Sequence, residues 1–171
     1  MRISNKEIWF TIGMLALSVV VILFTKMQIS ILGYSIALSD ILLNLILIID
    51  TLYCGLLSGI LLAIIIPVLS FVLTASSLIS SVPPMLPCLM IGNAVLVLFA
   101  WLARGKKLEL NLMPISLVAG SFAKAGVMSL IIVNWVLPHF NGMPYLLAGI
   151  VGTFFACVIW PLLTLGLKKI K

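Results

Sequence analysis

Six long apolar runs, separated by short polar or proline-rich segments, dominate this chain. A helix needs about 20 apolar residues to cross the hydrocarbon of a bilayer, and it satisfies its own backbone hydrogen bonds there. The apolar share of 64% is also well above the roughly 45–50% of a soluble domain. We therefore predict an all-α integral membrane protein, with one domain over residues 1–171 that forms a bundle of six transmembrane helices. The predicted spans are approximately 8–25, 41–57, 58–73, 88–103, 115–137 and 145–167.

The connections between these runs differ on the two sides of the predicted bundle. The second and third runs follow each other almost without a break, and Tyr53, Cys54 and Gly55 predict a tight turn there. The connections on the opposite side are longer: 26–40 is a loop of mixed polarity, and 74–87 and 138–144 are rich in proline. Proline restricts the backbone, so we expect ordered loops on this side.

Basic residues flank the predicted spans on one side. With the N-terminus inside, only Lys26 of the flanking cations falls outside, which is the positive-inside pattern of membrane proteins. The net charge of +6 therefore sets orientation and does not indicate nucleic-acid binding. We predict that both termini are cytoplasmic, together with the flanking cations Arg2, Lys6, Arg104, Lys106, Lys107, Lys168, Lys169 and Lys171.

Lys124 lies in the middle of the fifth apolar run. A charge at this depth costs at least about 2.5–3.5 kcal/mol, and such residues are usually paired or functional. Two interpretations are open at this point. Lys124 contacts a ligand, or it neutralises Asp50, the only carboxylate within a predicted span.

Several other polar residues are predicted to gather in the outer half of the bundle, provided that the fourth, fifth and sixth helices are neighbours. Amide, ammonium, imidazole and aromatic groups are what a small heterocyclic ligand requires for orientation and stacking. Asn93 could instead bond a neighbouring helix, and Tyr145 could be an interfacial anchor. The candidate substrate-binding residues are Asn93, Lys124, Asn134, His139, Asn141 and Tyr145.

The chain offers no constellation of catalytic residues. It has one histidine, no paired carboxylates, and no Gly-x-Ser-x-Gly or phosphate-binding glycine loop. The three cysteines are isolated in apolar surroundings, which is typical of packing. We therefore expect no enzymatic activity, no catalytic residue, no metal site and no cofactor.

Four segments together resemble a known family. The four segments are 44–55, the Leu-Leu-Ser-Gly of 56–59 that follows it directly, 67–73, and the proline-rich 82–93. Lys124 and the glycine-rich start of the sixth run also fit the family. Over essentially its whole length, the chain resembles the substrate-binding S components of energy-coupling factor (ECF) transporters. The resemblance implies a multi-pass protein of a prokaryotic cell membrane that captures a vitamin or its precursor from outside. It also implies two kinds of partner, a membrane coupling subunit and two ATPase subunits, and no nucleic acid.

The resemblance extends to the site and to the docking helix. Family ligand contacts fall, by position, on the candidate residues given above. Docking uses small residues of the first helix; Ala16 matches one position, Ile12 replaces the other, and Gly13 is the neighbouring substitute. Lys124 suits a carboxylate, a phenolate or a ring acceptor, and the absence of a buried acid near Asn93 disfavours a cation such as thiamine. Pyridine and pyrimidine vitamins, niacin and pantothenate remain open, as do a scaffold or assembly protein and a small secondary transporter.

Overall fold

The computed structural model describes residues 5–25, 27–73, 85–104, 113–135 and 141–169, and these are the residues discussed below. Six helices account for most of them, as predicted, and each lies within one helical turn of the range expected from the sequence. The elements in chain order are α1 (Asn5–Phe24), β1 (Gln28–Ile31), β2 (Tyr34–Ala37), α2 (Leu38–Cys54), α3 (Leu56–Leu73), α4 (Met85–Arg104), α5 (Met113–Trp135) and α6 (Met143–Lys169).

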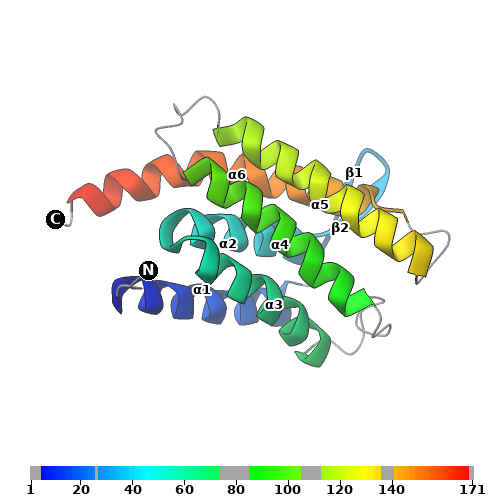
Figure 1. Cartoon of the computed structure of the whole chain (residues 1–171), viewed down its shortest axis with the longest axis horizontal. Helices are drawn as coiled ribbons and strands as arrows, with labels where there is room; N and C mark the ends of the chain where they lie inside the picture. Colours follow the sequence, from blue (N-terminus) through cyan, green and yellow to red (C-terminus); the bar gives the residue numbers. More distant parts are fainter. Residues whose placement is uncertain (1–4, 26, 74–84, 105–112, 136–140, 170–171) are drawn as a thin grey trace.

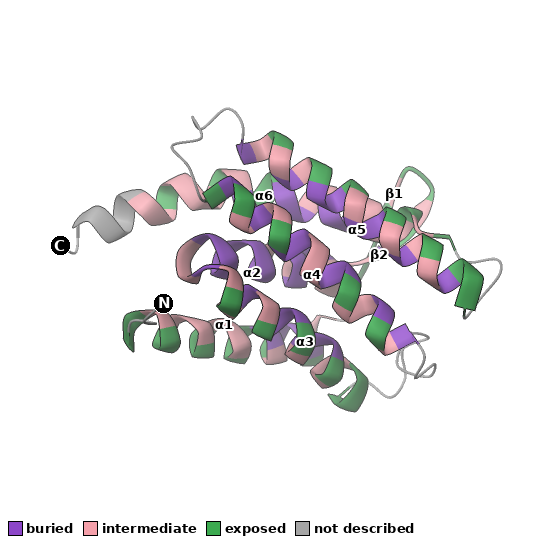
Figure 2. Cartoon of the chain, viewed as in Figure 1, coloured by how far each residue is buried: buried purple, intermediate pink, exposed green. Residues whose placement is uncertain are grey.

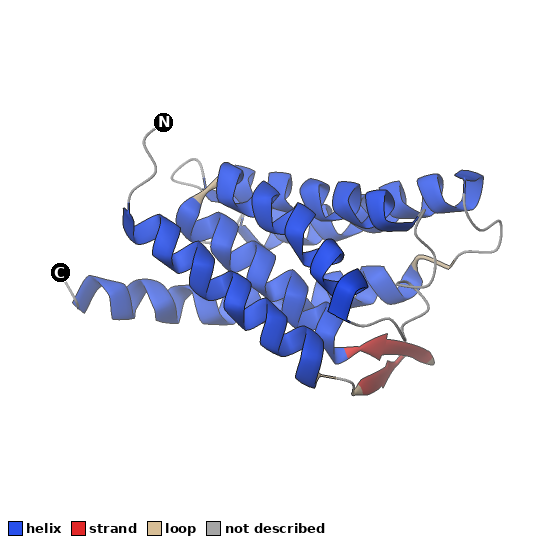
Figure 3. Cartoon of the chain, turned by 90° about the horizontal axis from the view of Figure 1, so that it is seen from below, coloured by secondary structure: helices blue, strands red, loops and turns tan. Residues whose placement is uncertain are grey.

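Successive helices run in opposite directions (Figure 1). The beginning of α1 and the end of α6 therefore lie at the same end of the bundle, which we call the termini end. The strands β1 and β2 lie at the opposite end, called here the hairpin end (Figure 3). The hairpin end thus carries the beginnings of α2, α4 and α6, and the end of α5.

The helices have the length and surface of a membrane bundle. Among the described residues, five helices are long and apolar enough to cross a membrane, and α2, with 17 residues, is shorter. Exposed positions alternate with intermediate or buried ones around the peripheral helices (Figure 2). Many of the exposed side chains are large and apolar, such as Trp9, Leu61 and Phe122. Lipid tails can cover such a surface, whereas water would not favour it.

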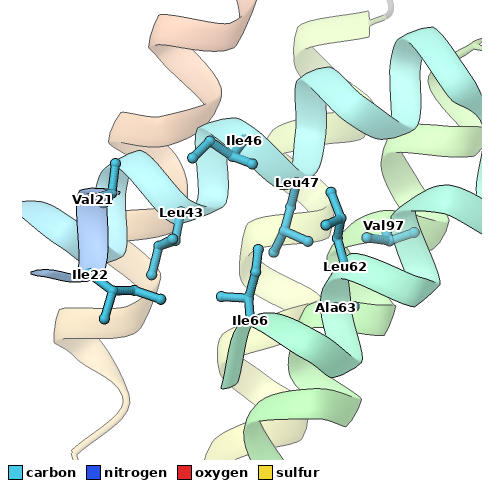
Figure 4. Packing of buried hydrophobic residues seen from close by; sticks show 9 residues of the cluster. All are labelled: Val21, Ile22, Leu43, Ile46, Leu47, Leu62, Ala63, Ile66 and Val97. Atoms are coloured by element: carbon cyan, nitrogen blue, oxygen red, sulfur yellow. The ribbon is translucent and has the colours of Figure 1, made fainter. Parts of the chain in front are cut away.

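Helix α2 is the centre of the bundle and packs against α1, α3, α4 and α6. Its residues are buried almost continuously from Ile46 to Leu52. In a bilayer, close van der Waals packing of this kind would replace the hydrophobic effect as the main source of helix association. Figure 4 shows the largest such contact, in which α2 meets α1, α3 and α4 through Val21, Ile22, Leu43, Ile46, Leu47, Leu62, Ala63, Ile66 and Val97.

The turn from α2 into α3 consists of Gly55 alone. Its φ of 108° lies in a region that side chains with a Cβ rarely adopt, and its N–H donates to the carbonyl of Thr51. A Cβ at this position would also collide with the guanidinium of Arg104, which donates to the carbonyl oxygen of Tyr53 at 2.7 Å. The turn and the end of α4 are thereby joined at the termini end.

The segment 26–40 contains structure that the sequence analysis did not predict. Where a loop of mixed polarity was expected, β1 and β2 form an antiparallel hairpin in which Ile31 pairs with Tyr34. The two residues of the turn, Leu32 and Gly33, have φ angles of 51° and 80°, and a two-residue hairpin turn needs such positive values. Ile36 anchors the hairpin, because its side chain is buried against Ile41 and Ala148.

Candidate functional site

Lys124 is buried in the interior of the bundle, with 5% of its surface exposed. Its Nζ donates to Asn44 Oδ1 at 2.6 Å and to Asn93 Oδ1 at 2.7 Å. The three residues come from α5, α2 and α4, and we call them the Lys124 cluster. Because an ammonium group only donates, both carboxamides must present their oxygen to it, and their nitrogens point elsewhere as donors.

Close packing of α4 on α5 brings the lysine to these partners. Gly92 precedes Asn93, and a Cβ there would approach Met128 Cγ to 2.5 Å and Lys124 Cγ to 3.4 Å. The missing side chain therefore leaves room for the aliphatic stem of Lys124 across α4. On the other side, Gly152 of α6 lies against Asn44, where a Cβ would be 3.1 Å from Asn44 Cβ. Glycines thus hold the helices close on two sides of the cluster.

Asp40 and Tyr145 add a second polar layer toward the hairpin end. Asp40 lies four residues before Asn44, hence one turn away on the same face of α2. It lies in the neighbourhood of both Lys124 and Tyr145, although no salt bridge joins it to the lysine among the described residues. Tyr145 packs beside Met85, Cys88, Met128 and Ile132. The arrangement is therefore a buried cation with a half-buried carboxyl group one turn above it.

These surroundings change two interpretations of charge that were drawn from the sequence. Of the two open interpretations of Lys124, pairing with Asp50 is wrong, because the acceptors of Lys124 are the amide oxygens of Asn44 and Asn93. The region is also not free of acid, since Asp40 lies one helical turn from Asn44 on the same face of α2. The argument against a cationic ligand therefore loses its basis.

Asp50 belongs to a separate group of side chains near the termini end. It is fully buried, and its Oδ2 is hydrogen-bonded to the hydroxyl of Ser58. Ser58 Oγ in turn lies 2.5 Å from Thr11 Oγ1, and Cys54 Sγ donates to the carbonyl of Glu7 at 3.4 Å. Asp50, Ser58, Thr11 and Cys54, here named the Asp50 cluster, join α2 and α3 to α1.

The remaining candidate residues have different surroundings. Asn134 is exposed and donates to the carbonyl of Leu130 in its own helix at 2.6 Å. Asn141 is exposed and accepts from the N–H of Met143 at 2.9 Å, which caps the entrance to α6. His139 lies outside the described residues. The structure therefore brings Lys124, Asn93 and Tyr145 into one region and gives Asn134 and Asn141 local backbone partners.

Asn44 and Asp40 are the residues that the sequence analysis did not include in the site. Their signal was available: a carboxylate and an amide four residues apart place two polar groups on one face of an otherwise apolar helix. The sequence analysis did not expect the second helix to be a neighbour of the fourth and sixth helices. α4 and α6 both pack against α2 as well as α5, so α2 supplies a wall of the site.

The docking residues proposed for the first helix lie on the outside of the bundle. Gly13 and Ala16 are both exposed, and a Cβ built on Gly13 would meet nothing within 4 Å. Buried positions of α1 are confined to Ser18, Val21 and Ile22. The face with the small residues is thus open to lipid or to another helix.

The chemistry available to the Lys124 cluster is that of binding. An ammonium has three donors, and among the described residues two oxygens accept from it, so one donor remains for a further acceptor. Within the same part of the chain, no three His, Cys, Asp or Glu side chains come together as metal ligands. Comparisons with protein-family models, with curated proteins and with solved structures find no match to this chain.

Proposed function

We propose that this chain is the substrate-capturing subunit of a membrane importer, of the kind represented by ECF S components. The observation that supports this proposal best is the Lys124 cluster, in which a buried ammonium meets two neutral oxygens and has one donor without an acceptor in the described part of the chain. A buried charge without a direct counter-ion is costly, and an acidic or acceptor group of a ligand would offset that cost. The substrate would be a small vitamin-like molecule bound in the half of the bundle nearer the hairpin.

The second polar layer narrows the type of substrate. Lys124 would bind a carboxylate, a phenolate or a ring acceptor, and Asp40 one turn away would accept from a ring N–H or an amine. Tyr145 at the beginning of α6 supplies an aromatic surface in the same region. These groups favour an amphoteric heterocycle of pyridine or pyrimidine type, and nicotinate and pantothenate are the acidic alternatives.

Orientation and partners complete the proposal. By the positive-inside rule the flanking cations favour a cytoplasmic termini end, so the hairpin end would face outward and receive the substrate. The exposed face of α1 around Gly13 and Ala16 would dock on a coupling subunit, which two ATPases drive. The membrane would be the cell membrane of a prokaryote.

Mass spectrometry of small molecules released from the purified chain tests the capture role directly. A stoichiometric vitamin or precursor would support the proposal and identify the substrate. A blank result, repeated after incubation with nicotinate, pantothenate and a mixture of pyridine and pyrimidine vitamins, would contradict it.

A separate experiment tests whether α1 docks on a coupling subunit through Ala16. Leucine at position 16 should leave capture unchanged and stop uptake by cells that contain the coupling module, because close helix approach needs a small side chain. Ala119→Leu is the matched control, since Ala119 is equally exposed on α5. Intact uptake by Ala16→Leu would move the docking face elsewhere.

One observation favours a second candidate, a membrane scaffold without a ligand. Lys124 joins α5 to α2 and α4 through two short hydrogen bonds, which would hold three helices in register by itself. A scaffold would use Lys124 for stability alone, and substitutions there would change unfolding without any effect on capture.

A further inference from the structure

The Asp50 cluster raises a separate question, because its carboxyl group is fully buried and has no counter-ion among the described residues. Among the described residues, Asp50 Oδ1 has no hydrogen-bond partner and Oδ2 is bonded to Ser58, while the side chains of Thr11 and Cys54 also lie close to the carboxyl group. An isolated carboxylate in such a place is far more costly than a neutral acid. The neighbouring hydroxyls indicate how the group is accommodated.

The hydrogen count of the cluster is informative. Three contacts join four oxygens in a row: Asp50 Oδ2 to Ser58 Oγ, Ser58 Oγ to Thr11 Oγ1, and Thr11 Oγ1 to the carbonyl of Glu7. Each contact needs one hydrogen, and the two hydroxyls supply two. A protonated Asp50 supplies the third. Asp50 then donates to Ser58, Ser58 to Thr11 and Thr11 to Glu7, and no pair of oxygens faces each other without a hydrogen.

Among the described residues, the groups around Asp50 offer no counter-charge. On its own helix the titratable residues at this end are Tyr53 and Cys54, and α1 contributes Glu7, whose carbonyl oxygen accepts from Thr11. The cations of this end with described side chains are Lys6 on α1 and Arg104 on α4, and no salt bridge joins either of them to Asp50. Helix α3 has no titratable residue. Helix α6 carries Cys157 beside Ile48 and Leu52, while its Tyr145 lies toward the hairpin end.

We propose that Asp50 is a proton-binding site whose neutral carboxyl group, through Ser58 and Thr11, holds the first half of α1 on α2 and α3. That half of α1 has no buried residue, so its attachment depends on a few contacts. They include the row of hydroxyl contacts from Asp50 through Ser58 to Thr11, the bond from Cys54 to Glu7, and the ring contact of Phe10 with Tyr53 at 4.3 Å between centroids. Loss of the proton would leave a buried negative charge beneath the helix and release it.

Infrared spectroscopy of the full chain in lipid nanodiscs tests the proton directly. At neutral pH we expect a carbonyl-stretch band of a protonated carboxylic acid that shifts in D₂O and is lost in Asp50→Asn. Asp40→Asn is the matched control, because the same substitution at the other end of α2 should leave this band in place. Absence of any band that depends on Asp50 would overturn the proposal.

Hydrogen exchange tests the consequence for α1. As pH is raised, amide exchange in residues 5–17, corrected for its intrinsic pH dependence, should increase in the wild type and stay constant in Asp50→Asn, which cannot ionise. Equal behaviour of the two proteins would refute the link between the proton and α1. A rise of the unfolding temperature with Na⁺ but not K⁺, lost in Asp50→Asn, would show a sodium site and overturn the proton assignment. Neither measurement depends on substrate binding at Lys124, so failure of this proposal would leave the proposed function untouched.

Discussion

The two buried polar clusters of this bundle both use α2, yet they have opposite hydrogen-bonding needs. Asn44 and Asp50 are six residues apart, which is about 9 Å along the helix and a rotation of about 240°. The Lys124 cluster has more donors than acceptors, whereas the Asp50 cluster has more acceptors than donors unless a proton is added. The first can therefore be completed by a ligand with an acceptor, and the second by a proton alone.

The largest effect should follow removal of the ammonium. Lys124→Met keeps an unbranched side chain of nearly the same length without the ammonium. It should weaken binding of nicotinate or pantothenate, whichever the wild type binds, by at least about 30-fold, measured by calorimetry. It should also lower the free energy of unfolding by about 1–3 kcal/mol, because Asn44 and Asn93 lose their donor.

Ser121→Ala provides the control for that substitution. Ser121 is buried three residues earlier on α5, and its hydroxyl lies 3.2 Å from Thr153 Oγ1, away from the cluster. It should reduce stability modestly and leave affinity unchanged. Unaltered affinity in well-folded Lys124→Met would remove Lys124 from the ligand site and leave the scaffold function.

Two substitutions of Asn93 distinguish the role of the Lys124 charge in binding from the role of the Lys124–Asn93 hydrogen bond in holding α5 to α4. Asn93→Asp keeps an oxygen for Lys124 but neutralises its charge, so the fold should persist while affinity for an acidic probe falls roughly tenfold or more. Asn93→Leu removes the oxygen but leaves the charge, so unfolding should become easier by about 1–3 kcal/mol and affinity should suffer less. A scaffold would respond only to the second substitution, which chemical unfolding and probe binding together would reveal.

The Asp50 cluster should show a stability effect without a binding effect. Ser58→Ala removes the hydroxyl that contacts both Asp50 and Thr11, so each of them loses a hydrogen-bond partner. The free energy of unfolding should fall by about 1–3 kcal/mol. Ser18→Ala on α1 is the control, since Ser18 bonds only to the carbonyl of Leu15 in its own helix. A change of probe affinity in Ser58→Ala would mean that the two clusters are coupled along α2.

The helices were predictable from sequence because the length of an apolar run directly limits where a buried helix can begin and end. The tight connection at Gly55 was visible for a related reason, since no polar residue separates the runs there. The hairpin was not predicted, because its two strands have four residues each and its turn is Leu-Gly in place of the common Asn-Gly.

The site was harder to predict than the helices because it depends on which faces meet. Lys124 was identified because a charge in the middle of an apolar run costs free energy. Asn93 was identified because it is a polar residue in the neighbouring apolar run, that of α4. Pairing with Asp50 was a plausible alternative from charge alone, but Asp50 faces α1 and α3, whereas Asn44 faces Lys124. Sequence spacing gives the face of each residue on its own helix; it does not give the neighbour of that face.

The smallest effect should come from Asn134, one of the positions carried over by resemblance. Asn134 lies ten residues beyond Lys124, about 15 Å along α5, and its amide already donates to Leu130 within the helix. Asn134→Ala should therefore change unfolding by less than about 0.5 kcal/mol and leave probe affinity unaltered, in contrast to Lys124→Met. A tenfold loss of affinity would instead extend the ligand site along α5 to the hairpin end, and the Lys124 cluster would then be its inner limit.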